Sequence, residues 1–255
     1  MPIGTPVGLG SASSTSTGTN HFTITTSGAV PAGALMVMSS GTVTIATGVN
    51  VISVVATDGI NTNNFVPAIQ VVNLYETIFE DLWYCPNALP LNTSATVTIN
   101  YGNSLGFSGS GVAAGVCYVT GLAGINPFDS NADNTAGYTF SSTQAVPVTT
   151  LGSSLYSSHE ILFGSTTAIS SSGALSFTDD GAFTNLYNAS LQTNTIYWGF
   201  SYRIVSNNSP VTYDPTITYT GGVSVSAGLN IAPFSDTPIG VARPFATSGA
   251  PFVSM

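Results

Sequence analysis

The residues whose type and spacing could support chemistry are few, and most of them are acidic. Residues 129–134, DSNADN, carry oxygen-bearing side chains at alternate positions, as in loops that bind Ca²⁺. The segment lacks a glycine at its sixth position, and Phe140 occupies the twelfth, where such loops carry glutamate. Two interpretations of Asp129, Asn131 and Asp133 therefore stay open: a Ca²⁺ site, or a turn held by its own polar side chains. No other cofactor or metal is indicated.

Paired carboxylates could hydrolyse a glycosidic bond if they lay at the right separation across a cleft. Glu76, Glu80 and Asp81 form the densest acidic group, and Asp179 and Asp180 form the next. On a helix, Glu76 and Glu80 would lie four residues apart on one solvated face. The second pair precedes a glycine, which is typical of a turn. We therefore predict a solvated face and a turn rather than a catalytic pair.

Other catalytic patterns are missing from the sequence. There are two histidines, His21 and His159, and each lies at the start of an alternating, strand-like segment. Residues 106–110, GFSGS, depart from the G-x-S-x-G pattern of a nucleophile elbow at the last position. The chain has no lysine, which excludes Schiff-base chemistry and a Walker A phosphate loop. We predict that the protein is not an enzyme.

The charge balance also excludes several partners. Two basic residues, Arg203 and Arg243, stand against eleven acidic ones, which gives a net charge of −9. Such a chain repels nucleic acids and anionic membrane surfaces. No stretch of about eighteen apolar residues could cross a membrane, and the first residues have no signal-peptide pattern. We predict no nucleic acid partner, no membrane partner, and a surface made mostly of Ser, Thr, Asn and Gly.

Two-residue alternation of apolar and polar residues dominates the chain and predicts half-buried strands. The clearest segments are 196–204, 211–219 and 223–231, separated by turn residues at 207–210 and 221–222. They predict neighbouring strands of an antiparallel sheet with one buried face. Tyr197 falls on the polar side of the first segment, where it could stack on a glycan. The alternative is that Tyr197 packs beneath a loop or a neighbouring subunit.

These patterns predict an all-β protein, an antiparallel β-sandwich with jelly-roll-like connections. No internal sequence repeat and no interdomain linker is evident. Residues 1–19 are rich in Gly, Ser and Thr and predict an N-terminal arm, flexible or docked. Residues 20–236 form the predicted sandwich domain, and residues 237–255, which contain three prolines, form a predicted extended C-terminal arm.

Two local features remain open in this sandwich. In residues 74–83 apolar pairs recur every four residues, and Asn73 and Glu76 have capping-box spacing, so the pattern predicts a short helix. The only two cysteines, Cys85 and Cys117, lie in apolar, strand-like segments. We interpret them as buried free thiols, with a single disulfide as the alternative.

Several segments, taken in order, resemble a loose group of uncharacterised all-β proteins from tailed phages and prophages, often encoded among virion structural genes. The similar segments lie within residues 20–234: 29–38 (AVPAGALMVM), 82–89 (LWYCPNAL), 95–99 (ATVTI), 124–129 (GINPFD), 202–205 (YRIV) and 211–213 (VTY). The resemblance implies a sandwich fold and a role on a particle surface, and supplies no catalytic residues. It also implies a strand at 77–85, against the helix that the local pattern predicts.

Together these observations predict a non-enzymatic structural protein on the outside of a virus particle, either a capsid decoration protein or a spike or fibre component. Its partners would be other virion proteins and further copies of itself, a trimer being one option, held through the uncharged terminal arms. The alternative is a carbohydrate- or receptor-binding adhesin that contacts a host-surface glycan. A glycan array and an analysis of purified particles separate the two.

Overall fold

The computed structural model describes residues 2–15, 19–43, 50–72, 78–103, 111–152, 154–191, 195–221 and 224–239. Every regular element in these ranges is a β-strand, and the strands pair antiparallel throughout. The predicted all-β class and β-sandwich architecture are confirmed. Within the same ranges there is no helix that could span a membrane.

The first half of the chain forms two sheets. The first inner sheet has the order β1-β9-β3-β7-β6, and the first outer sheet has the order β2-β8-β4-β5. Their bounds are β1 Val7–Ser14, β2 His21–Thr25, β3 Leu35–Val43, β4 Val51–Thr57, β5 Thr62–Asn64, β6 Val66–Val72, β7 Ile78–Cys85, β8 Thr96–Tyr101 and β9 Gly111–Val119.

The second half forms its own sheets. The second inner sheet has the order β10-β19-β13-β16-β15, and the second outer layer consists of a three-stranded sheet, β11-β18-β14, and a pair, β12-β17. Their bounds are β10 Asn134–Phe140, β11 Gln144–Ala145, β12 Val148–Thr149, β13 Glu160–Ser170, β14 Ala174–Thr178, β15 Thr184–Leu191, β16 Ile196–Val205, β17 Thr212–Tyr213, β18 Thr216–Thr220 and β19 Val225–Ser235.

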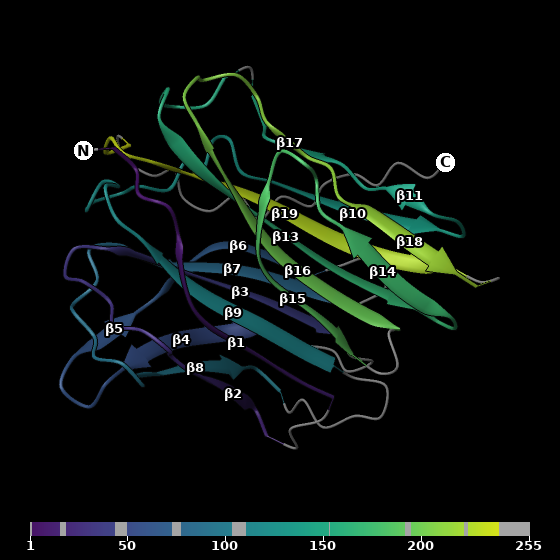
Figure 1. Cartoon of the computed structure of the whole chain (residues 1–255), viewed down its shortest axis with the longest axis horizontal. Coiled ribbons are helices and arrows are strands. Elements are labelled where there is room, and N and C mark those ends of the chain that lie inside the picture. The colour runs from purple at the N-terminus through teal and green to yellow at the C-terminus, as the bar shows by residue number, and fades with distance from the viewer. Residues whose placement is uncertain are drawn as a thin grey trace.

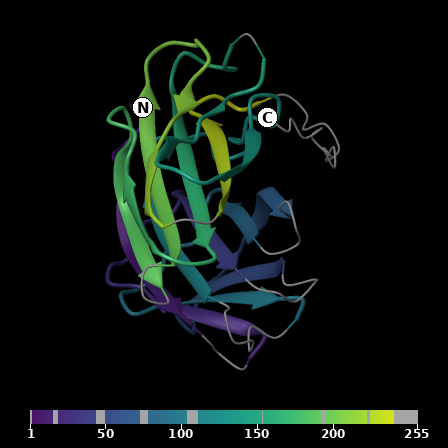
Figure 2. The same ribbon diagram turned by 90° about the vertical axis from the view of Figure 1, so that its right-hand side faces the viewer.

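The four layers enclose three cores, and the two views agree on the stacking (Figures 1 and 2). One core lies between the first outer and first inner sheets and includes Phe22, Met38 and Tyr101. A second lies between the two inner sheets and combines residues of both halves, such as Leu82 and Phe163. The third fills the space between the second inner sheet and the outer strands. Both inner sheets are therefore buried on both faces in their central strands.

The two halves repeat one strand order. With β5, β12 and β17 left out, the strands of the two halves correspond in chain order: β1, β9, β3, β7 and β6 match β10, β19, β13, β16 and β15, and β2, β8 and β4 match β11, β18 and β14. No strand of one half pairs with a strand of the other among the described residues. The single sandwich predicted over 20–236 thus consists of two stacked sandwiches, and the repeat is visible in topology rather than in sequence.

Burial on both faces explains why the helix predicted over 74–83 is wrong. Residues 78–83 belong to β7, in agreement with the strand that the resemblance implies; residues 73–77 lie outside the described part. Ile78 and Leu82 enter the core between the inner sheets, whereas Phe79 and Trp83 enter the core of the first sandwich. Apolar pairs in a strand need no helix when each face has a core of its own.

The three segments predicted as neighbouring strands do not lie side by side. Segments 196–204 and 223–231 contribute β16 and β19 to the second inner sheet, with β13 between them, and segment 211–219 contributes β17 and β18 to the outer layer. The alternation itself is confirmed, because Tyr213, Ile217 and Leu229 all enter the same core. Periodicity assigns the face of a residue, but it does not determine which strands pair.

The described parts of the two predicted arms pack on the sandwiches. Within residues 1–19, β1 is an edge strand of the first inner sheet and buries Leu9 completely. At the other end, Ile239 is buried and its N–H donates to the carbonyl oxygen of Asn126 at 3.0 Å. The remainder of the predicted C-terminal arm, residues 240–255, lies outside the described residues.

Candidate functional site

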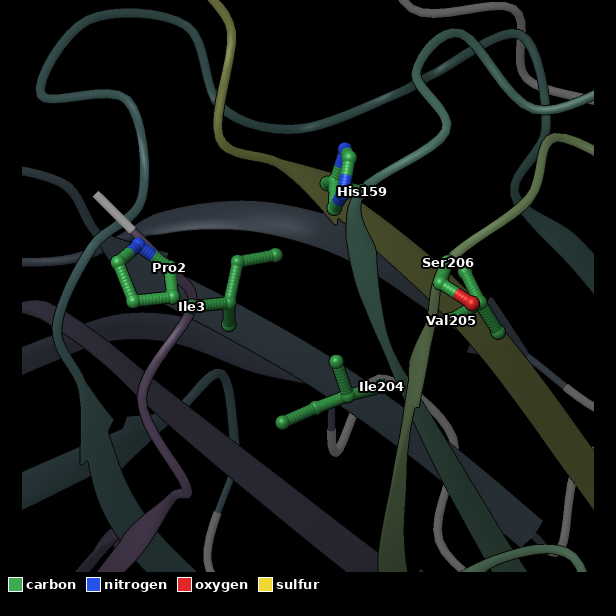
Figure 3. A pocket seen from close by; sticks show the side chains of 6 residues that line it. All are labelled: Pro2, Ile3, His159, Ile204, Val205 and Ser206. Carbon is green, nitrogen blue, oxygen red and sulfur yellow. The ribbon is translucent and has the colours of Figure 1, made fainter.

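A shallow pocket of about 200 Å³ lies where the N-terminal segment meets the start of β13 and the end of β16 (Figure 3). Its lining is mostly apolar and consists of Pro2, Ile3, His159, Ile204, Val205 and Ser206. His159 is the single titratable side chain of this lining, and its Nδ1 lies 3.2 Å from the hydroxyl of Ser158. The pocket can receive a small apolar group, but no carboxylate lines it to form an acid–base pair.

The loop considered as a possible Ca²⁺ site is a turn in which the carboxylate of Asp129 points inward. Asp129 is 2% exposed, and its two carboxylate oxygens accept the backbone N–H groups of Asn131 at 3.1 Å and Tyr156 at 3.0 Å. Burial raises the pKa of Asp133 to about 7. Within the described ranges, no three His, Cys, Asp or Glu side chains are arranged to hold a metal ion. In the segment of Asp129, Asn131 and Asp133, the carboxylate of Asp129 therefore stabilises the turn before β10 by accepting backbone hydrogen bonds.

A second acidic group, which the sequence did not single out, lies next to this turn. Glu160 is fully buried, and its Oε1 accepts the N–H of Ser157 at 2.7 Å. Burial, then the charges of Asp129 and Asp236, raise the pKa of Glu160 to about 7. The hydroxyl of Ser157 lies 3.3 Å from Asp236 Oδ1, so this group ties the 154–159 loop to the end of β19. Only its place as the first residue of β13 could have indicated this role.

The acids considered as a catalytic pair cannot act on one substrate. Glu80 and Asp81 are adjacent on β7, so their side chains enter different cores and neither is solvated. The predicted solvated face is wrong for these two residues, because the expected helix is a strand buried on both sides. Glu76 lies outside the described residues.

Burial dominates the electrostatics of this acid pair. Neither carboxyl oxygen of Glu80 has a hydrogen-bond partner, although the hydroxyls of Ser165 and Thr167 lie close enough to lower its pKa in part. Desolvation outweighs them and raises the pKa of Glu80 well above its usual range. Asp81 accepts a hydrogen bond from Gln70 Nε2 at 3.2 Å, and burial still raises its pKa to about 7. Glu80 therefore lies between the two halves as a buried acid whose neutral form is favoured by desolvation.

Tyr197 offers no face to a glycan. It is 6% exposed, and its ring stacks on Phe177 of β14 with the centroids 4.6 Å apart and the planes at 15°. The outer strands cover the side of β16 that the sequence assigned to the polar surface, so the interpretation of Tyr197 as buried is the correct one. Asp180 accepts the N–H groups of Ala182 and Asp214, which confirms the predicted turn.

The histidines and cysteines also fail to converge. His21 lies on β2 of the first half, and His159 precedes β13 of the second half. Cys85 and Cys117 are buried free thiols, one in the core of the first sandwich and one in the core between the inner sheets. Burial raises the pKa of Cys85 to about 11 and that of Cys117 further. The predicted free thiols are confirmed, and both stay protonated at neutral pH.

No protein family model matches the chain, and no curated protein matches it in sequence. The structure is a layered scaffold whose buried acidic groups make contacts within the protein. Large apolar side chains are exposed on its loops. These include Ile60 at 80% exposure, Ile125 at 71% and Tyr156 at 51%.

Proposed function

We propose that this protein is a non-enzymatic structural component of the surface of a virus particle, a capsid decoration protein or a part of a spike or fibre. The observation that carries the proposal is the doubled strand order. In each half the chain passes repeatedly between the inner and the outer layer. In the first half, β1, β3, β6, β7 and β9 lie in the inner sheet and β2, β4, β5 and β8 in the outer one. We infer that each half is a jelly roll, a connectivity found in viral capsid and lectin domains.

The surface chemistry supports the same role. A protein with 5% charged residues makes subunit contacts through Ser, Thr, Asn and backbone groups, which avoids the desolvation cost of charged side chains. The acids that are buried among the described residues, Glu80, Asp81, Asp129 and Glu160, have structural surroundings rather than a shared cleft. Such a surface supports packing against neighbouring proteins.

Analysis of purified particles tests the proposal. Mass spectrometry should detect the chain in particles at a stoichiometry comparable with that of other shell or tail proteins, and cryo-electron microscopy should place its two stacked sandwiches on the outer surface. A chain that is missing from washed particles and free in the cytosol of the host would contradict the proposal.

One observation favours the adhesin as a second candidate. Tyr156 lies on the 154–159 loop with half of its surface exposed, and its hydroxyl donates to the carbonyl oxygen of Pro238 at 3.4 Å. An exposed aromatic ring can stack on a sugar, and jelly rolls include lectins. A glycan array should show saturable binding that Tyr156→Ala removes, with the buried Tyr197 left unchanged. An array without binding would remove this candidate.

A further inference from the structure

The four edge strands of the two inner sheets are not equally protected. Edges expose unpaired backbone groups, and proteins often block them with bulges, prolines or charges. The ladders of β1, β6 and β15 each contain a register shift, and β6 also contains Pro67. β10 pairs with β19 over all seven of its residues without a shift, and its sequence, NTAGYTF, has neither proline nor charge. β10 is therefore the one regular edge of the inner sheets.

The backbone hydrogen bonds of β19 show which groups of β10 point outward. On the side of β19 toward β10, Ser235 N–H donates to Pro127 O at 2.7 Å and Pro233 O accepts from Asp129 N–H at 3.0 Å. Residues two apart in a strand direct their backbone groups to the same side, so Ile231 also bonds toward β10, where it pairs with Asn134. The even-numbered residues of β10 thus bond to β19, and the odd-numbered ones point their N–H and C=O groups away.

The outward groups of β10 are accessible except for the N–H of Thr135, which donates to Asn134 Oδ1 at 2.8 Å. Gly137 and Thr139 are exposed, and within the described residues no backbone hydrogen bond joins either of them to a segment beyond β19. Asn134 Nδ2 donates to Thr149 O at 2.6 Å, and Tyr138 donates its hydroxyl to Pro147 O. The 147–149 segment therefore covers one face of β10 and leaves its backbone edge open.

The corresponding strand of the first half, β1, is irregular by contrast, and its Leu9 O accepts the N–H of Ser27 at 2.6 Å. Tyr187 of β15 donates to Val116 O at 3.2 Å and accepts the N–H of Gly10 at 2.8 Å, so its hydroxyl bridges the bulge in the β1–β9 ladder. Its ring lies so close to Gly8 and Gly115 that a Cβ at either glycine would overlap it. The repeated topology thus has one bulged and one regular edge at equivalent positions.

We propose that β10 is a self-association edge, on which β10 of a second copy adds antiparallel about a two-fold axis at Gly137. This register places Gly137 opposite Gly137 of the partner and Thr135 opposite Thr139. The two glycines exchange a pair of backbone hydrogen bonds, and the N–H of Thr139 in each copy donates to Thr135 O of the other, while the N–H of Thr135 keeps its bond to Asn134 Oδ1. Threonine pairs across strands stabilise a sheet, and the same patch serves both copies, as a two-fold interface requires.

Charge favours a second copy as the occupant. Two chains of net charge −9 repel one another over most of their surfaces, whereas residues 134–140 carry no charge. Joining β10 to its copy also continues the second inner sheet into one sheet across both molecules. This inference goes beyond the proposed role on a particle, because self-association is measurable in the isolated protein and holds or fails whether or not the chain is found in virions.

Single-cysteine cross-linking tests the register directly, because the native cysteines are buried. Gly137→Cys should form a covalent dimer under mild oxidation or with a short bis-maleimide, at twice the 26.0 kDa of the chain. Ser176→Cys, at an exposed position of edge strand β14, is the matched control and should form no covalent dimer. Cross-linking of both variants to the same extent would overturn the register.

Sedimentation equilibrium tests the association without a cross-link. The unmodified protein should show a concentration-dependent dimer, and Gly137→Pro should shift it to the monomer, because proline removes an outward N–H without breaking the β10–β19 ladder. Thr139→Lys is a milder second variant that should also shift the equilibrium to the monomer, whereas Ser176→Lys should not. A protein that stays monomeric at every concentration, or a dimer that both β10 variants leave intact, overturns the proposal.

Discussion

The two halves of the molecule share a strand order but build their outer layers differently. The first outer sheet is one continuous ladder of four strands over a core that includes Met36, Met38 and Val97. The second outer layer is split into two small sheets and packs through ring contacts, Phe177 on Tyr197 and Phe183 on Tyr213. The inner sheets, buried on both faces, have the same strand order. The outer layers differ in how their strands are divided into sheets, because they cover different side chains of the inner sheets.

A second difference concerns the edges. β1 and β10 occupy equivalent positions. β1 has a bulge bridged by the Tyr187 hydroxyl, and its Leu9 O accepts the N–H of Ser27, whereas no side chain of the described residues donates to or accepts from the outward backbone of Gly137. Topology alone therefore does not decide whether an edge is regular. A bulge and a contact to Ser27 disrupt one edge, whereas its counterpart stays regular.

The largest effect should come from breaking the core that the halves share. Trp198 is 1% exposed between the inner sheets, and its Nε1 donates to Ser39 Oγ at 3.3 Å. Trp198→Ala should lower the free energy of unfolding by about 3–5 kcal/mol. Urea unfolding followed by circular dichroism measures the loss. Tyr156→Ala, half exposed, should stay within about 0.5 kcal/mol of the unmodified protein.

The same experiment tests whether the halves are one cooperative unit. Because the shared core contains residues of both halves, we expect a single transition that Trp198→Ala moves as a whole. Two separate transitions in the unmodified protein, or a variant that destabilises one half only, would show that the sandwiches fold independently.

The next effect concerns Glu80, the buried acid between the halves. The pKa of Glu80 is raised in the folded state, so the folded protein binds more protons than the unfolded one above pH 4.5, and stability falls as pH rises toward the folded pKa. Asp81 and Glu160, each raised to about 7, act in the same sense. The protein should therefore unfold at a higher temperature at pH 5 than at pH 8.

Glu80→Gln should separate the contribution of this residue. The variant should match the unmodified protein at pH 5 and exceed its stability at pH 8 by about 1–3 kcal/mol, because the cost of a buried unpaired acid is removed. Asp58 is the control: it is partly exposed and accepts the backbone N–H groups of Ile60, Asn61 and Asn92, which lower its pKa. Asp58→Asn should change stability equally at both pH values. A Glu80→Gln effect that is independent of pH would contradict the burial argument.

A smaller effect than that of Trp198→Ala should follow from adding a methyl group at Gly41, which faces Trp198 in the shared core. A Cβ on Gly41 would overlap Thr167 Oγ1 and Trp198 Cδ1 across the inner sheets. Gly41→Ala should destabilise by about 1–3 kcal/mol. Gly181→Ala is the matched control, because no atom lies within 4 Å of its added Cβ. Equal effects at the two glycines would show that the inner sheets can shift apart without cost.

The smallest expected effect sharpens the comparison of the edges. Tyr187→Phe removes one hydroxyl that accepts from Gly10 N–H and donates to Val116 O, and should cost about 1 kcal/mol. Hydrogen exchange should increase at the amide of Gly10 and stay unchanged at Gly137. Unchanged exchange at Gly10 would show that the Tyr187 hydroxyl does not protect this amide.

Much of the fold could be predicted from local pattern. Alternation over 196–204 assigned Trp198 and Tyr197 to opposite sides of a strand, and the structure confirms this assignment. The all-β class, the free cysteines and the turn at Asp180 also follow from residue types. The pattern could not predict that both sides are covered, because a strand does not show how many layers stack on it. For that reason Tyr197 was a candidate for a glycan contact and β7 was predicted as a helix.

The candidate sites depended still more on tertiary contacts. The spacing of Asp129, Asn131 and Asp133 fits a Ca²⁺ loop as well as a turn, and the backbone N–H groups of Asn131 and Tyr156 decide for the turn. Tyr156 lies 27 residues from Asp129, so no local pattern contains this partner. Glu160 and Tyr187 gain their roles in the same way, through segments distant in sequence.

By itself, the sequence determined the strand periodicity, the sparse charge and the lack of lysine, because these depend on residue type and on the two-residue repeat of a β-strand. The tertiary structure decided that the chain doubles one strand order, that Glu80 is buried between the halves, and that the β10 edge is regular while the β1 edge is bulged. These features arise from which sheets stack and which edges meet, and residues far apart in the chain set them through packing.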